Sequence, residues 1–389
     1  MCGKPQKERP VANSNLLTLT AIKADVGSRG GHTQPSEEMV AVCEEEMHNA
    51  VGETLLDCRV TTTGDDICML MSHLPENGPS VNDLAWKALD RAGDIAKTQG
   101  LYGAKQDLLT SAPSGNVRGA GPGVASITFA TDAPERPAET FMVVTADKCG
   151  PGIFNFLFGK VFTDPDMAAG LMLPNMLDGF TFTMIDMEHV EPGKNVDRVI
   201  RLDGGKELPK LKLLLRGEDE YGILAIHSNR YPHQQVASTS TDRLHSIAGV
   251  YKGKDDPVGL VRTQGIFPAP EELMSPFTVA PYVAGDARGS HNMPLMPVPI
   301  NTAVTGVYCL PIVSAMAYSI TPEGMFSEGV DMFDNPAWDS TRKKAQLKAM
   351  LMREQGSFGC AMLPYSQLEY AAYRKVMEDL NERFVTESR

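Results

Sequence analysis

The 389-residue sequence lacks an excess of basic residues, a Cys-x-x-Cys spacing and any apolar run long enough to span a membrane. Its 49 acidic and 36 basic residues give a net charge of -13, which argues against nucleic acid or an anionic membrane as the main partner. The seven cysteines are scattered, with no spacing typical of zinc or redox sites, so we expect reduced thiols. These absences predict a soluble cytoplasmic protein.

The rest of the composition predicts one large globular unit. A hydrophobic content of 42% is ample for a sizeable core, and the chain contains no internal repeat and no sharp change of composition. The polar opening has no apolar signal-peptide region. We therefore expect residues 1–14 to form a flexible tail and residues 15–389 to form a single domain.

Acidic residues follow three apolar segments that have the pattern of β-strands. The predicted strands are Leu16 to Ala24, Leu55 to Thr63 and Phe141 to Ala146. The acids that follow them are Asp25, the pair Asp65 and Asp66, and Asp147, with His32 seven residues after Asp25. An isolated Asp-Asp pair is ordinarily a solvated turn, but strand-end carboxylates on one sheet edge can gather around a cation. The pattern leaves both interpretations open.

Other segments give weaker predictions of secondary structure. Apolar spacing indicates helices over residues 36–52, 80–100, 341–355 and 366–384, and further strands over 67–72, 180–190 and 221–228. The region 150–250 is expected to be rich in β-structure. The proline- and glycine-rich stretch 265–311 is expected to be ordered loop.

A glycine-rich segment, Ser114 to Gly123, has the composition of a phosphate-binding loop. Its backbone N–H groups are open to a ligand, although it matches neither a Walker loop nor a dinucleotide fingerprint. A tight surface loop is the competing interpretation. Lys148 and Arg288 are further phosphate-binding candidates, although isolated basic side chains are usually surface charges.

Lys254 stands immediately before a second pair of acids, Asp255 and Asp256. A lysine must be neutral to form a Schiff base with a carbonyl substrate, and adjacent carboxylates favour its charged ammonium form. A simple salt bridge is therefore expected unless divalent cations offset the carboxylates. In that case Tyr251 is a candidate proton donor and acceptor.

Taken together, these motifs closely resemble the bifunctional fructose-1,6-bisphosphate aldolase/phosphatase family of archaea and deep-branching bacteria. The resemblance runs from about Leu16 to the C-terminal helix and is carried by the segments 25–32, 64–66, 101–109, 114–123, 146–148, 251–257, 288–291 and 368–370. It implies an α/β fold of the α+β type, a single large layered α-β-β-α domain, and a homo-octamer.

The resemblance also implies a gluconeogenic activity. A member of this family joins dihydroxyacetone phosphate and glyceraldehyde 3-phosphate into fructose 1,6-bisphosphate, and then removes the C1 phosphate with the help of Mg²⁺. Lys254 would form the Schiff base, Tyr251 would be its acid and base, and Asp25 would be the base of the phosphatase step.

The ligand sets follow from the same resemblance. The implied Mg²⁺ ligands are Asp25, His32, Asp65, Asp66, Gln106, Asp147, Asp255 and Asp256. The implied substrate contacts are His32, Tyr102, Gly115, Asn116, Lys148, Gln264, Gly265, Arg288 and Tyr370. The sequence departs from the family where Thr305 replaces an aspartate that contacts sugar hydroxyls.

Two other functions remain open at this stage. One is a Mg²⁺-dependent sugar phosphatase without aldolase activity, in which Lys254 only pairs with carboxylates. The other is a non-catalytic sugar-phosphate-binding protein in which the metal cluster serves the structure.

Overall fold

The computed structural model describes residues 15–108, 121–189, 196–240, 242–243, 252–279, 283–287, 291–306, 310–354 and 371–388. The predicted tail at residues 1–14 lies outside this set. The helices are α1 (Glu37–Ala50), α2 (Gly78–Thr98), α3 (Ile153–Val161), α4 (Leu208–Arg216), α5 (Pro270–Val279), α6 (Asp339–Glu354) and α7 (Ala371–Arg383). None of the described helices is both long enough and apolar enough to cross a membrane.

Two sheets form the centre of the molecule. The smaller sheet has the order β10 (Asp242–Arg243), β4 (Gly123–Ala130), β1 (Leu16–Ala24), β3 (Asp66–His73) and β2 (Asp57–Thr63). The larger sheet has the order β14 (Met296–Pro297), β15 (Ile312–Ile320), β5 (Glu139–Asp147), β11 (Val258–Thr263), β9 (Gln235–Thr239), β8 (Tyr221–Ser228), β6 (Phe180–Asp186), β7 (Val196–Asp203) and β17 (Val385–Ser388), with β16 (Val330–Asp331) beside β15. A separate hairpin contains β12 (Val283–Ala287) and β13 (His291–Pro294).

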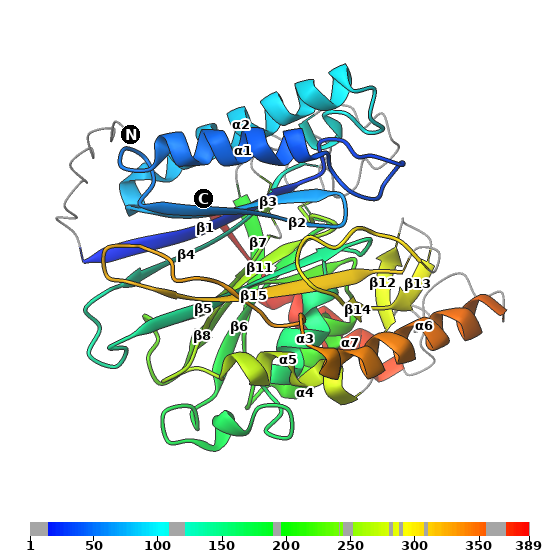
Figure 1. The fold of residues 1–389 in the computed structure, drawn as a ribbon. Coiled ribbons are helices and arrows are strands. Elements are labelled where there is room, and N and C mark those ends of the chain that lie inside the picture. The colour runs from blue at the N-terminus through cyan, green and yellow to red at the C-terminus, as the bar shows by residue number, and fades with distance from the viewer. Residues whose placement is uncertain are drawn as a thin grey trace.

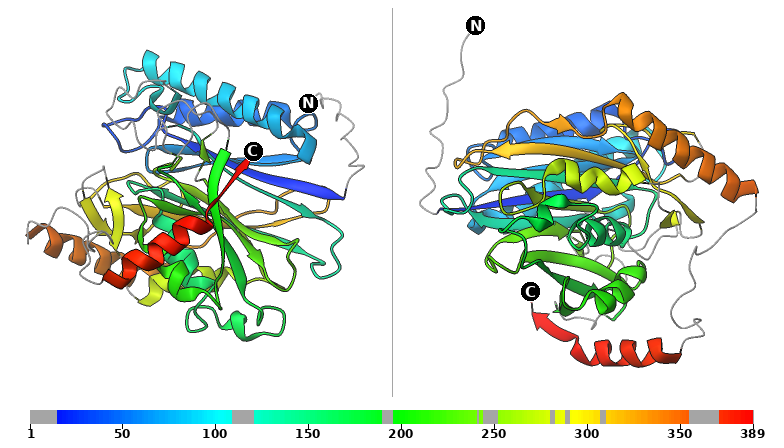
Figure 2. Two further views of the ribbon diagram at one scale, coloured as in Figure 1. Left: turned by 180° about the vertical axis from the view of Figure 1, so that it is seen from behind. Right: turned by 90° about the horizontal axis from the view of Figure 1, so that it is seen from below.

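The elements stack as helices, sheet, sheet and helices (Figure 1). Helices α1 and α2 cover the outer face of the smaller sheet, and α3, α4, α5 and α7 lie against the larger one. Figure 2 shows α6 and α7 well apart, with β17 continuing α7 to the sheet edge beside β7. The prediction of an α/β fold is confirmed.

Alternation along β1 explains how the two sheets meet. Leu17, Leu19 and Ala21 point to one face and pack with side chains of β5, β11 and β15 in the core between the sheets. Because successive side chains of a strand alternate between faces, Lys23 belongs to the same face as these apolar residues. The strand therefore carries a lysine into the space between the sheets at its C-terminal end.

Several predicted elements have different bounds or types. The stretch expected to be ordered loop contains α5, and the region expected to be β-rich contains α3 and α4. The strand predicted over 180–190 ends at Asp186, because the Asp186 carboxylate accepts the backbone N–H groups of Glu188 and His189 and so stabilises a turn.

Candidate active site

The acidic residues predicted at strand ends lie close together, at one end of the two sheets. Asp25 follows β1, Asp65 lies in the turn between β2 and β3, Asp66 begins β3, and Asp147 ends β5. All four are buried, with exposed fractions of 7% or less. Two strands of the smaller sheet and one of the larger sheet thus supply a single carboxylate cluster.

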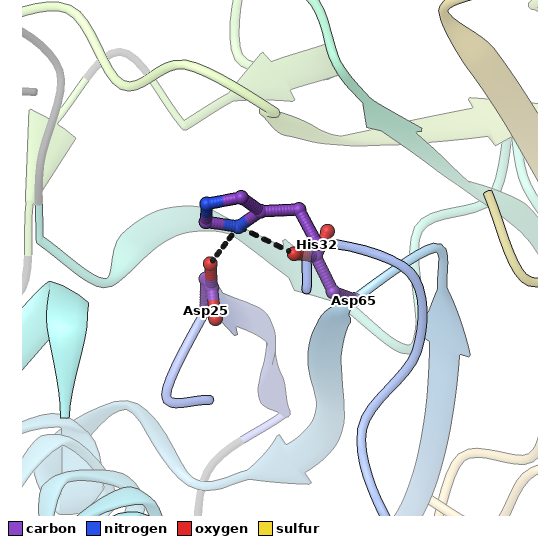
Figure 3. A group of neighbouring side chains, drawn as sticks. All are labelled: Asp25, His32 and Asp65. Carbon is purple, nitrogen blue, oxygen red and sulfur yellow. Dashed lines mark hydrogen bonds and ion pairs between the residues drawn. The ribbon is translucent and has the colours of Figure 1, made fainter. Parts of the chain in front are cut away.

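The imidazole of His32 lies between two of these carboxylates (Figure 3). Its Nδ1 is 3.1 Å from Asp65 Oδ2 and 3.6 Å from Asp25 Oδ2. Hydrogen bonds with Asp25 and Asp65 raise the pKa of His32 to about 9. Burial, together with the negative charge of Asp65, raises the pKa of Asp25 to about 6. A proton shared by this group is therefore held tightly at neutral pH.

Asp65, Asp66 and Asp147 form a second group around the same point. Each offers an oxygen within 4.8 Å of the others, and Asp66 Oδ1 is buried with no hydrogen-bond partner among the described residues. Burial raises the pKa of Asp66 and of Asp147 well above the usual range of a carboxyl. Closely spaced buried carboxylates with an unused oxygen are a donor set that fits a hard divalent cation.

Two buried lysines partly neutralise the cluster. Lys148 Nζ contacts Asp65 and lies 2.9 Å from Asp147 Oδ1. Lys23 Nζ contacts Asp66 and donates to the backbone oxygen of Asp256 at 2.8 Å. Burial alone would lower the pKa of Lys148, but the charges of Asp147 and Asp65 raise it well above its ordinary value. Both lysines are therefore permanent cations beside the candidate metal ligands.

Lys254 is buried at the edge of this cluster, with an exposed fraction of 2%. Its Nζ lies 3.2 Å from Asp107 Oδ2 and 3.9 Å from Asp255 Oδ1. Burial opposes the charged form, but Asp107 and Asp255 outweigh it and raise the pKa of Lys254 above that of a free lysine. In this arrangement Lys254 is an ammonium ion, as its acidic neighbours in the sequence predicted.

Asp256 is fixed by the strand-end loop of β5. Its Oδ1 accepts the Cys149 N–H at 2.8 Å, and its own N–H donates to Cys149 O at 2.9 Å. Both Asp256 (φ 51°) and Lys148 (φ 62°) are in the left-handed region, which non-glycine residues rarely adopt. Such strained backbone is common at functional sites, where surrounding contacts hold it in place.

Gln106 and Tyr102 lie on the other side of Asp25. Gln106 Nε2 donates to Asp25 Oδ2 at 3.1 Å, while its Oε1 is buried without a hydrogen-bond partner in the described chain. Tyr102 packs edge-on against His32, with 4.8 Å between ring centroids, and is more than half exposed. The structure therefore brings every predicted metal ligand, together with Tyr102, Lys148 and Lys254, to one region.

Two predicted substrate contacts lie far from this site in space. Gln264 and Gly265 follow the C-terminal end of β11, whereas Lys254 precedes its N-terminal end. The strand places about 20 Å between these ends. Within one chain, Gln264 and Gly265 therefore do not join the site around Lys254.

Five predicted site residues lie outside the described residues, namely Tyr251, Gly115, Asn116, Arg288 and Tyr370. The departure at Thr305 lies in an exposed loop beside the β2–β3 turn. There Gly64 N donates to Thr302 O at 2.9 Å, and Val304 N donates to Thr33 O at 3.0 Å.

Sequence reasoning missed Lys23 and Asp107. Lys23 could have been found from its position, because a lone charge on the apolar face of a buried strand needs a partner. Asp107 follows the predicted ligand Gln106 and precedes two leucines, so nothing in its local pattern separated it from an ordinary turn residue.

Comparisons with known proteins show which family this chain resembles. A family profile described as fructose-1,6-bisphosphatase matches residues 16–385. A Thermus thermophilus protein named fructose-1,6-bisphosphate aldolase/phosphatase is 46% identical over 370 residues, which cover 95% of this chain and 99% of that protein. Proteins of the same name from Cenarchaeum symbiosum and Methanocaldococcus jannaschii are 40% and 39% identical, covering 95% and 96% of this chain and 95% and 93% of their own lengths.

Proposed function

Because this chain belongs to the fructose-1,6-bisphosphatase family, we propose that it is a gluconeogenic enzyme with two activities in one site. It condenses dihydroxyacetone phosphate with glyceraldehyde 3-phosphate, and it hydrolyses the C1 phosphate of the product to give fructose 6-phosphate. The observation that carries this proposal is the position of Lys254, a buried amine within the same carboxylate cluster that fits divalent cations.

The carboxylate cluster supports Mg²⁺ as the cation. The proposed ligands are Asp25, His32, Asp65, Asp66, Gln106, Asp147, Asp255 and Asp256. Bound Mg²⁺ would shield the phosphate charge and lower the pKa of water for attack on the phosphate ester. Oxygen donors dominate this set, which suits Mg²⁺ better than softer metals. His32 must lose the proton that Asp25 and Asp65 hold on it before its nitrogen can bind a cation.

The amine of Lys254 supplies the aldolase chemistry. Its nitrogen adds to the ketone carbon of dihydroxyacetone phosphate, and the ketone oxygen leaves as water. The net change converts one ammonium and one ketone into one protonated iminium and one water, so charge is conserved. The iminium acidifies the adjacent C–H group, and loss of that proton gives an enamine whose carbon attacks the aldehyde while the aldehyde oxygen takes up a proton. Water then hydrolyses the product iminium and returns Lys254 to its amine form. Tyr251 is the proposed acid and base for the proton transfers.

Charged and aromatic side chains around the cluster support substrate binding. Lys148 is a phosphate-binding candidate because its ammonium group lies beside Asp65 and Asp147 at the cluster. Tyr102 presents an exposed ring beside His32, where a sugar phosphate can pack. Asp25 is the proposed base of the hydrolytic step, since its carboxylate lies with His32 and Asp65 in the group that fits a cation and its activated water.

One experiment tests both activities together. The purified protein is given both triose phosphates with Mg²⁺, and fructose 6-phosphate and inorganic phosphate are measured. We expect both products from the wild type. The Lys254→Arg variant keeps a positive charge but loses an amine that can deprotonate, so it should release phosphate from added fructose 1,6-bisphosphate without condensing triose phosphates. Absence of both activities in the wild type would refute the proposal.

A phosphatase without aldolase activity is the second candidate. The observation that favours it is the ion pair of Lys254 with Asp107, which holds the amine in its unreactive form. This candidate predicts that Lys254→Arg hydrolyses fructose 1,6-bisphosphate and that even the wild type condenses no triose phosphates.

We further propose assembly into a homo-octamer. Leu347, Met350 and Leu351 recur at helical spacing on α6 and are each at least half exposed, so this stripe offers an apolar contact surface. A second copy would also have to supply Gln264 and Gly265 if they contact substrate at Lys254. Light scattering should give about eight times the 42.2 kDa chain mass. A monomer under conditions of full activity would contradict this assembly.

A further inference from the structure

Asp107 is a buried carboxylate that the proposed metal site does not use. Its exposed fraction is 3%, and it lies in a 3-10 turn, Gln106–Leu108, directly after the proposed ligand Gln106. Its contacts join three separate segments of the chain. Oδ2 accepts the Asp25 N–H at 2.9 Å and lies 3.2 Å from Lys254 Nζ, while Oδ1 accepts the Gly121 N–H at 3.2 Å.

These contacts fix the carboxylate in place before any substrate arrives. Backbone donors on two sides prevent the side chain from turning away, and the Asp107 N–H donates to Asp25 O at 3.0 Å. The other carboxylate near the amine, Asp255, is farther away at 3.9 Å and belongs to the proposed Mg²⁺ ligands. When cations take up Asp255, Asp107 is the described carboxylate that still faces the nitrogen.

We propose that Asp107 is the counter-ion of the protonated iminium that Lys254 forms with the ketone substrate, an inference that rests on the proposed aldolase activity. Ammonium and iminium both carry one positive charge on the same nitrogen, so a fixed carboxylate stabilises both. The neutral amine and the neutral carbinolamine, which form on the way from the ammonium to the iminium, are not stabilised by its charge. Asp107 therefore favours accumulation of the covalent intermediate over its neutral precursors.

The counter-ion also sets the direction of the new bond. An ammonium group has three N–H donors and can satisfy several acceptors at once. The iminium keeps a single N–H, and Asp107 Oδ2 is the nearest described carboxylate oxygen to that nitrogen. A hydrogen bond from this N–H to Asp107 fixes the plane of the iminium, and so determines which face of the adjacent carbon meets the aldehyde.

The test measures the covalent adduct separately from hydrolysis. Wild type and Asp107→Asn are incubated with dihydroxyacetone phosphate and borohydride, and the reduced adduct on the Lys254 peptide is quantified by mass spectrometry. When Asp107 loses its charge, the free ammonium can still pair with Asp255, whereas the iminium keeps a single N–H directed at Asp107, so the adduct should fall by about tenfold or more. Hydrolysis of fructose 1,6-bisphosphate with Mg²⁺ should fall much less, because Asp107 is outside the proposed metal ligands.

A matched control removes the carboxylate partner of a neighbouring lysine. Asp197 Oδ1 lies 3.4 Å from Lys252 Nζ, two residues before Lys254, and Asp197 is similarly buried at 5% exposure. Asp197→Asn removes a lysine counter-ion without touching Lys254, so it should trap adduct at the wild-type level. If Asp107→Asn fails to fold, Asp107→Glu and Asp107→Gln are compared instead, since they are alike in size and differ in charge.

The outcomes separate the counter-ion from other roles. Selective loss of adduct in Asp107→Asn, or more adduct in Asp107→Glu than in Asp107→Gln, supports the proposal. An equal fall of adduct and hydrolysis overturns it in favour of a structural role in holding Asp25. Wild-type adduct levels in Asp107→Asn overturn it while leaving the aldolase activity standing. Absence of adduct on Lys254 in the wild type overturns both.

Discussion

Lys23 shows how a single residue connects the fold to the site. It belongs to the face of β1 that carries Leu17, Leu19 and Ala21, and its side chain is fully buried. At that position it meets Asp66 and the backbone of Asp256. The alternation of a strand therefore delivers a fixed positive charge to a cluster of acids that would otherwise repel one another.

Removing this charge should destabilise the protein. Lys23→Met leaves Asp66 buried without its cation, and breaking one side of a buried ion pair costs about 3 kcal/mol of unfolding free energy. Urea unfolding in the presence of chelator measures this loss. Lys206→Met is the control, because Lys206 is 86% exposed and lies 3.8 Å from Asp203; its unfolding midpoint should hardly move. Equal stability of the two variants would contradict this role of Lys23.

The proposed metal ligands allow a second prediction for a single residue. Asp66→Asn keeps the size of the side chain and removes a fully buried carboxyl from the proposed metal ligands, so hydrolysis of fructose 1,6-bisphosphate should fall by orders of magnitude. A phosphate-release assay over a range of Mg²⁺ concentrations measures it. Asp339→Asn, at a 72% exposed side chain, should retain full activity. Wild-type hydrolysis by Asp66→Asn, or in chelator, would refute the metal assignment.

Among the elements, those that end in acids were the most predictable. Strands β1 and β5, which lead to Asp25 and Asp147, have strong apolar patterns. The prediction of a single sheet edge was wrong, because β1 belongs to the smaller sheet and β5 to the larger one. Helix α3 was missed because its sequence is almost entirely apolar, so it lacks the spacing of an amphipathic helix. Helix α5 was missed because it contains Pro276 and lies in a proline-rich stretch.

The position of Gln264 and Gly265 could not be predicted from local sequence patterns either. A resemblance gives residue roles without saying which chain supplies them, and only the course of β11 reveals their separation from Lys254. For the same reason the contact between Asp107 and Lys254 was unpredictable, because it joins segments almost 150 residues apart that carry no shared pattern.

The turn between β2 and β3 gives a prediction at the scale of elements. Gly64 has φ 60°, and an added Cβ would lie 1.5 Å from Asp147 Oδ2. Gly64→Ala should therefore displace Asp147, lower the unfolding midpoint and abolish hydrolysis. Gly52→Ala is the matched control, since Gly52 has φ 87° but nothing within 4 Å of an added Cβ. It should lose only about 1 kcal/mol, the cost of a left-handed residue, and keep its activity.

At the scale of the whole molecule, two sheets from different layers enclose buried acids at their shared end. Lys23 and Lys148 offset part of the repulsion among these charges. Protons on His32 and on carboxyl groups with raised pKa values offset more of it, and in our proposal Mg²⁺ does so as well. Protons and cations therefore compete for the same groups, and global stability without metal should depend on pH.

The direction of this dependence follows from the raised pKa values. The pKa of His32 is about 9 in the folded chain against an ordinary value of 6.5, so its contribution to stability is complete below pH 6.5 and is lost as the pH rises through 9. The pKa of Asp25, about 6 against 3.8, acts in the same direction at lower pH. The pKa values of His73 and His227 are lowered by burial, so both are neutral above pH 6.5 and do not contribute to a fall in stability there.

The unfolding midpoint in chelator should therefore fall between pH 6.5 and pH 9, the range over which His32 loses its excess proton. Saturating Mg²⁺ should flatten the profile, because the cation replaces the proton as partner of Asp25 and Asp65. His32→Gln should fall less steeply than the wild type in chelator, which distinguishes this group from general repulsion in a chain of net charge -13. A fall of the same steepness in His32→Gln would assign the pH dependence to other groups, and a midpoint that rises with pH would contradict the proposed proton on His32.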